Sequence, residues 1–79
     1  MEQPIISPVV HIPTDPDFYG DVATDADATR AAAVLRRIVH QIDPGAHVIL
    51  DAPGHSARNE KTGAVLLDIA WARFCAGTY

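Results

Sequence analysis

The chain is short of cysteine, of long apolar runs and, over its first third, of positive charge. One cysteine in 79 residues excludes an intrachain disulfide and favours a reducing, cytoplasmic setting. The sequence contains no run of 18 apolar residues, so no membrane span is predicted. It also contains no basic segment followed by an apolar stretch, so no secretion signal is predicted. A sequence pI near 5.3 argues against direct binding to nucleic-acid phosphates, which requires a concentrated basic face.

The acidic residues are gathered at the start of the chain. Residues 1–29 hold six of the ten acids and none of the six bases. Aspartate side chains are short and keep their charge close to the backbone, and an acidic protein favours basic partners. We therefore expect a basic protein surface as the partner, contacted by five aspartates and the adjacent aromatic pair, namely Asp15, Asp17, Asp21, Asp25, Asp27, Phe18 and Tyr19.

The composition predicts one folded domain over residues 1–79. With 48% hydrophobic and 20% charged residues the chain is too apolar for a disordered tail. A chain of this size buries only about 60–65% of the surface that it exposes when unfolded, so its stability margin is small. The first residue is Met, and we expect a complete small reading frame.

The clearest local signal predicts a helix over residues 25–42. Thr24 and Asp27 form a capping-box-like start, and Pro44 with Gly45 ends the segment. The apolar residues between these signals recur at helical spacing, at Ala28, Ala31, Ala32, Leu35, Ile38, Val39 and Ile42.

Two short strands are expected on either side of this helix. The β-branched run 9–12 is flanked by prolines, which confines it to a sheet edge. Residues 46–50 predict a second strand, closed by the turn residues 51–54. Residues 14–21 are expected to form a polar loop, and residues 55–62 a loop or the first turns of a helix.

Residues 64–76 fit two patterns. Alternation favours a strand that pairs with residues 46–50, whereas the stripe Ala64, Leu67, Trp71 and Phe74, followed by Gly77, favours a helix. The segment is apolar on nearly all sides and needs a cover. We predict an α+β fold with one main helix on a short sheet, and a homodimer contact around Leu67 and Trp71.

No motif fixes a reaction. His47, Asp51 and His55 are spaced at four and four and would suit a divalent ion, but surface histidines and a turn aspartate explain the same pattern. Gly54-His55-Ser56 lacks the second glycine of a nucleophile elbow, and Cys75 is expected to be a buried, inert thiol. We therefore expect neither an enzyme nor a cofactor.

The Phe18–Tyr19 pair has two interpretations: simple packing of its loop on the body, or an exposed aromatic anchor for a partner. In size, acidity and single cysteine, the whole chain resembles the phage-encoded anti-CRISPR proteins, many of which are small acidic modules that occlude nucleic-acid-binding surfaces. The resemblance rests on no motif and assigns no site residue. It implies a stoichiometric inhibitor of a bacterial nucleic-acid-handling defence complex. The alternatives are a small homodimeric structural or regulatory subunit and, third, a metal-dependent enzyme.

Overall fold

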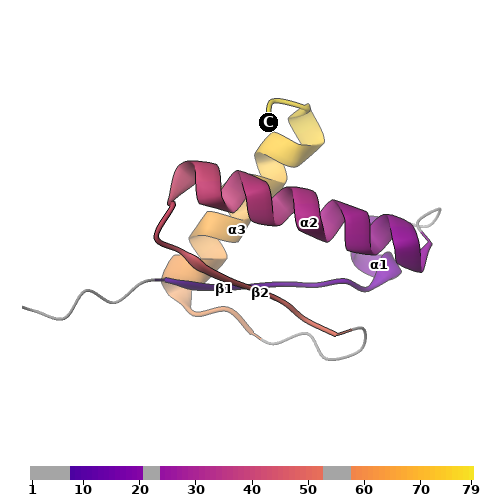
Figure 1. Cartoon of the computed structure of the whole chain (residues 1–79), viewed down its shortest axis with the longest axis horizontal. Coiled ribbons are helices and arrows are strands. Elements are labelled where there is room, and N and C mark those ends of the chain that lie inside the picture. The colour runs from indigo at the N-terminus through magenta and orange to yellow at the C-terminus, as the bar shows by residue number, and fades with distance from the viewer. Residues whose placement is uncertain (1–7, 21–23, 53–57) are drawn as a thin grey trace, which may run out of the picture.

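The computed structural model describes residues 8–20, 24–52 and 58–79. The elements follow one another as β1 (Val9–Ile12), α1 (Pro16–Tyr19), α2 (Asp25–Ile42), β2 (His47–Leu50) and α3 (Lys61–Ala76). Helix α2 lies above the two strands, α3 crosses it, and α1 lies beneath the N-terminal end of α2 (Figure 1). The predicted α+β fold is confirmed.

The strands β1 and β2 form a two-stranded parallel sheet, in register from Val9 opposite His47 to Ile12 opposite Leu50. Parallel strands need a crossover, which α2 supplies. Burial alternates along β1, so that Val10 and Ile12 face the helices, whereas Val9 and Ile49 on the other face of the sheet are exposed. Both predicted strands are confirmed, and they pair with each other.

Helix α2 begins and ends where its local signals placed it. The Thr24 hydroxyl accepts a hydrogen bond from the Asp27 backbone N–H at 3.1 Å, and the Asp27 carboxylate accepts one from the Thr24 N–H at 3.3 Å. These reciprocal bonds satisfy two of the donors that every helix N-terminus leaves open. The buried residues all lie on the predicted stripe, at Ala28, Ala32, Leu35, Ile38 and Val39.

The segment 64–76 is a helix, so its interpretation as a strand is wrong. Helix α3 begins earlier, at Lys61, and ends at Ala76. The next residue, Gly77, has a φ of 71°, which is the left-handed cap conformation that glycine favours. As a helix, the segment places Leu66 and Ala70 in the core against α2 and β1. Leu67 and Trp71, on which the homodimer contact was predicted, pack against the core, and the large apolar side chains that α3 exposes are Val65 and Ile69.

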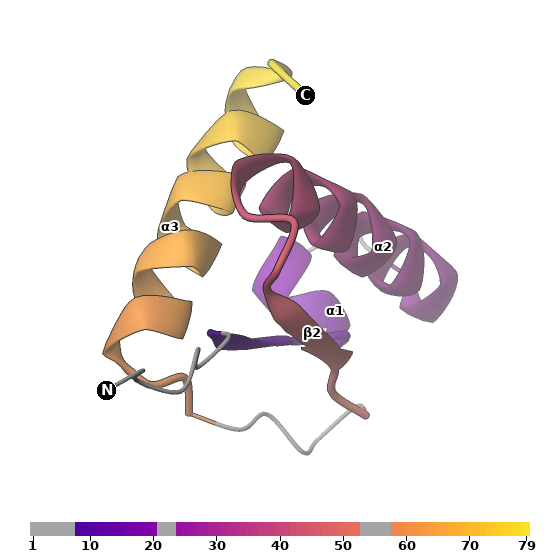
Figure 2. The same cartoon turned by 60° about the vertical axis from the view of Figure 1, so that its left-hand side comes forward.

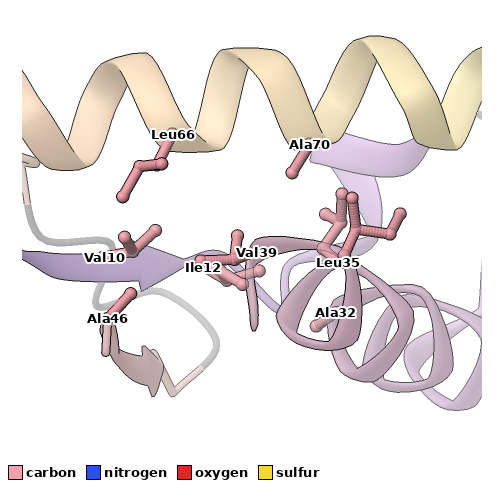
Figure 3. Close-up of a cluster of buried hydrophobic side chains, with 9 residues drawn as sticks. Val10, Ile12, Ala32, Leu35, Val39, Ala46, Leu66 and Ala70 are labelled. Carbon is pink, nitrogen blue, oxygen red and sulfur yellow. The ribbon is translucent and has the colours of Figure 1, made fainter. Parts of the chain in front are cut away.

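The core lies where α2, α3 and β1 meet (Figure 3). Leu66 of α3 points toward Val10 of β1, and Ala70 lies beside Leu35 of α2. Small residues let the elements approach closely, and one such close approach is at Gly63. A Cβ atom at that position would lie 2.2 Å from the carbonyl oxygen of Val9.

Three further observations concern the surface. The predicted loop 14–21 contains the single turn α1, because Pro16 is compatible with the first turn of a helix.

Cys75 is exposed, so the expectation of a buried thiol is wrong. The residue lies on the outward side of α3. Within residues 8–20, 24–52 and 58–79, the helices are too short or too polar to cross a membrane.

Candidate functional site

The five aromatic side chains of the protein form one continuous series of ring contacts, here called the aromatic chain. Trp71 lies at its centre, with ring centroids 5.0 Å from Phe18 and 5.6 Å from Phe74. Phe18 also contacts Tyr19 at 4.9 Å, and Phe74 contacts Tyr79 at 5.9 Å. The aromatic chain therefore fastens α1 to the C-terminal half of α3.

Phe18 and Tyr19 have different roles within the aromatic chain. The Tyr19 hydroxyl donates a hydrogen bond to the Pro13 carbonyl, and burial raises the pKa of Tyr19 to about 12. Phe18 remains 40% exposed although its ring contacts Trp71. The packing interpretation thus describes Tyr19, and Phe18 has the exposure that an aromatic anchor needs.

Four of the five predicted aspartates lie at one end of the molecule, because α1 is placed beneath the start of α2 (Figure 1). We call Asp15, Asp17, Asp25 and Asp27 the acidic end. Asp15 is half-buried and the other three are exposed. Asp21 lies outside the described residues.

The four carboxylates differ in how far the fold depends on them. Asp27 closes the capping box with Thr24, and Asp15 has an interaction of its own. Asp17 and Asp25 have no hydrogen bond or ion pair from their carboxylates among the residues that the structure describes. These two charges are therefore the ones most available to a partner.

A groove of about 370 Å³ connects the acidic end to the aromatic chain. It is open to one side and runs between α2 and the C-terminal part of α3, with lining residues Tyr19, Asp27, Arg30, Ala31, Val34, Phe74 and Tyr79. Its walls are aromatic and aliphatic, and Asp27 and Arg30 supply one charge of each sign. Such a groove suits an apolar side chain of a protein partner whose neighbouring residues are basic.

The structure also brings together a second group of polar residues, which no pattern in the sequence predicts. His11 Nδ1 donates to the Asp51 carboxylate over 2.9 Å, and Asp51 is only 8% exposed. The Asn59 side chain accepts from the His11 backbone N–H at 2.6 Å and donates to the His11 carbonyl at 2.9 Å. Asn59 thus takes the place of a neighbouring strand at the outer edge of β1. We call His11, Asp51 and Asn59 the edge clasp.

The edge clasp contains two of the three members of a hydrolytic triad, because a histidine held by a buried carboxylate is the usual general base. A groove of about 280 Å³ lies beside it, lined by Val9, His11, Arg58 and Glu60. Within the described part of the chain, no hydroxyl or thiol is hydrogen-bonded to the other ring nitrogen of His11. The contacts that the clasp does make join three distant segments of the chain, which is a structural role.

The structure describes two of the three proposed metal ligands, His47 and Asp51. His47 is exposed on β2, whereas the carboxylate of Asp51 is engaged by His11. His55 lies outside the described residues. Over the described ranges, no group of three or more histidine, cysteine, aspartate or glutamate side chains is placed to bind a metal ion.

Replacing Asn59 with alanine tests the edge clasp. The change leaves the N–H and C=O groups of His11 without the partners that they now have, and we expect the free energy of unfolding to fall by about 1–3 kcal/mol. Urea denaturation measures this loss, with Arg58→Ala as the exposed neighbouring control. Equal stability of the two variants would show that Asn59 does not hold the edge of β1.

Comparison with known protein families, with curated proteins and with solved structures finds no match to this chain. The features that bear on its function are therefore the acidic end, the aromatic chain and the groove between them.

Proposed function

We propose that the protein is a non-enzymatic binding module that presents its acidic end and the adjoining groove to a basic surface on a protein partner. One observation carries the proposal: the exposed ring of Phe18 and the groove lie beside three exposed aspartates. Aromatic anchors in grooves supply much of the affinity of protein interfaces, and surrounding charges guide association.

The charge distribution along α2 supports this orientation. Asp25 and Asp27 begin the helix, whereas Arg36, Arg37 and His40 are exposed in its C-terminal half. A molecule charged in this way turns its acidic end toward a basic partner during approach. The same charges complement the helix dipole. The stability of α2 and the proposed function therefore both favour acidic residues at the start of the helix and basic residues in its C-terminal half.

The resemblance to anti-CRISPR proteins suggests a narrower form of the proposal. In this form the partner is a nucleic-acid-handling complex in the cytoplasm of a bacterial host, and the protein is its stoichiometric inhibitor. Carboxylates along α1 and the first turn of α2 would then occupy positions that otherwise bind phosphates. Size, acidity and the clustering of the aspartates support this form.

The test removes two charges and leaves the fold intact. We expect Asp17→Asn combined with Asp25→Asn to weaken binding about five-fold, since exposed charge pairs contribute roughly 0.2–1 kcal/mol each. Immobilised protein captures the partner from bacterial lysate at low salt, and the purified partner is then titrated by calorimetry.

The matched control is Asp43→Asn combined with Glu60→Gln, which removes two charges far from the acidic end. The Asp43→Asn change keeps a side-chain oxygen that can accept the hydrogen bond now donated by the Gly45 N–H at 3.0 Å. Equal weakening by both double variants would mean that net charge, and not the acidic end, determines binding.

A further inference from the structure

The outward face of α3 carries an apolar stripe that nothing in the described part of the chain covers. Val65 is 50% and Ile69 is 39% exposed, and both Ala72 and Ala76 are exposed. These four residues, here called the outer stripe, are spaced by four, three and four positions. Spacing of this kind is typical of the seam between two coiled helices. Figure 2 shows α3 standing at one side of the molecule, with the other elements all on its inner side.

Two opposite charges flank the outer stripe. At 3.6 residues per turn, Asp68 lies on one side of the stripe and Arg73 on the other, and both are exposed. They are five positions apart. In a parallel helix pair, side chains with this spacing on opposite flanks of the seam meet across the interface.

We propose that the outer stripe is the interface with a second copy of this chain, with the two α3 helices packed in parallel. A two-fold axis parallel to the two helices relates the copies. Each residue of the outer stripe then meets its own counterpart, and Asp68 of each copy lies beside Arg73 of the other. An antiparallel pair would instead place the two Asp68 side chains on one flank and the two Arg73 side chains on the other. The charges therefore select both the partner and its orientation.

This interface goes beyond the proposed function, because it uses a different surface. Trp71 and Phe74 lie on the inner side of α3, away from the outer stripe, and the acidic end belongs to α1 and α2. A dimer formed through the outer stripe presents two acidic ends at once, which raises avidity for a partner with repeated sites. The two surfaces can be tested separately.

The first experiment is disulfide cross-linking of Ala76→Cys in a Cys75→Ser background. In a parallel pair the two copies of residue 76 face each other, within the separation of about 4.4–6.8 Å between Cα atoms that a disulfide requires. In an antiparallel pair centred on the stripe they are about 16 Å apart along the helices, at 1.5 Å per residue. We expect the oxidised variant to run as a covalent dimer, and Gln41→Cys in the same background, at an exposed position of α2, to form no covalent dimer.

The second experiment exchanges the flanking charges. Asp68→Arg and Arg73→Asp should each raise the dimer dissociation constant about ten-fold, since each replaces two attractive pairs with two repulsive ones. The double exchange Asp68→Arg with Arg73→Asp restores the attraction and should bring the constant back to within about two-fold of the wild-type value. Sedimentation equilibrium measures the constants, and circular dichroism confirms folding.

A wild-type mass of 8.5 kDa at high micromolar concentration, without cross-linking at residue 76, would overturn the proposal. A dimer that fails to cross-link at residue 76, or whose affinity the charge exchange does not restore, would overturn the parallel arrangement.

Discussion

Replacing Trp71 with alanine is expected to lower the free energy of unfolding by about 3 kcal/mol. This is the lower end of the range measured for large aromatic residues in cores, because the ring is only half-buried. Trp71 contacts Phe18, Tyr19 and Phe74, so its loss detaches α1 from α3 as well as opening a cavity. Urea denaturation, followed by far-UV circular dichroism, measures the change.

The size of this loss matters because the total is small. At roughly 0.05–0.15 kcal/mol per residue, the whole chain is stable by about 4–12 kcal/mol. Trp71→Phe retains an aromatic ring and should cost less than half as much as alanine. Phe18→Ala removes a more exposed ring and should leave the protein folded. A loss below about 1 kcal/mol for Trp71→Ala would contradict the central place of Trp71 in the aromatic chain.

Gly63→Ala is expected to destabilise the protein by about 1–3 kcal/mol, which is opposite in sign to the ordinary effect of this change in a helix. Within a helix alanine is favoured over glycine by about 1 kcal/mol. At this position, however, a Cβ would lie 2.2 Å from the Val9 carbonyl oxygen. The obstructing atom belongs to the backbone, so α3 or β1 must move.

The neighbouring exposed position supplies the control for Gly63. Thr62→Ala places the same side chain on the outer side of the first turn of α3, and it should change stability by no more than about 0.5 kcal/mol. Thermal or urea unfolding of the two variants gives the comparison. A gain in stability for Gly63→Ala would show that α3 does not lie as close to β1 as the structure places it.

The elements that could be predicted from the sequence are those that local chemistry specifies. Thr24 and Asp27 cap the start of α2, and Pro44 prevents its continuation, so both ends of that helix follow from neighbouring residues. The short strands follow in the same way from β-branched runs bounded by proline or turn residues. None of these predictions depended on a distant contact.

The segment 64–76 could not be assigned because its apolar pattern fits both periods. Its helical state goes with the packing of Leu66 and Ala70 against residues of α2 and β1. The exposure of Cys75 and the inward position of Leu67 are likewise set by which face of α3 meets α2 and β1. Packing of this kind involves residues far apart in the chain.

The candidate site likewise has one part that local sequence signals predict and another that depends on contacts between residues far apart in the chain. Charge and capping preference identified Asp17, Asp25 and Asp27, which are exposed at one end of the molecule. The separate roles of Phe18 and Tyr19 depend on Trp71 and on the Pro13 carbonyl. The edge clasp was missed because Asn59 and His11 are 48 positions apart, and no local pattern marks a side chain that substitutes for a strand.

The most direct test of the proposed function is the affinity for the captured partner as a function of salt, compared between the wild-type protein and the variant Asp17→Asn with Asp25→Asn. Exposed charges are screened over about 10 Å at 0.1 M salt. The wild-type affinity should therefore fall as salt rises, and the two curves should converge at high salt. Phe18→Ala should instead weaken binding by a similar factor at every salt concentration. A wild-type affinity that does not change with salt, with the double variant binding equally well, would contradict recognition through the acidic end.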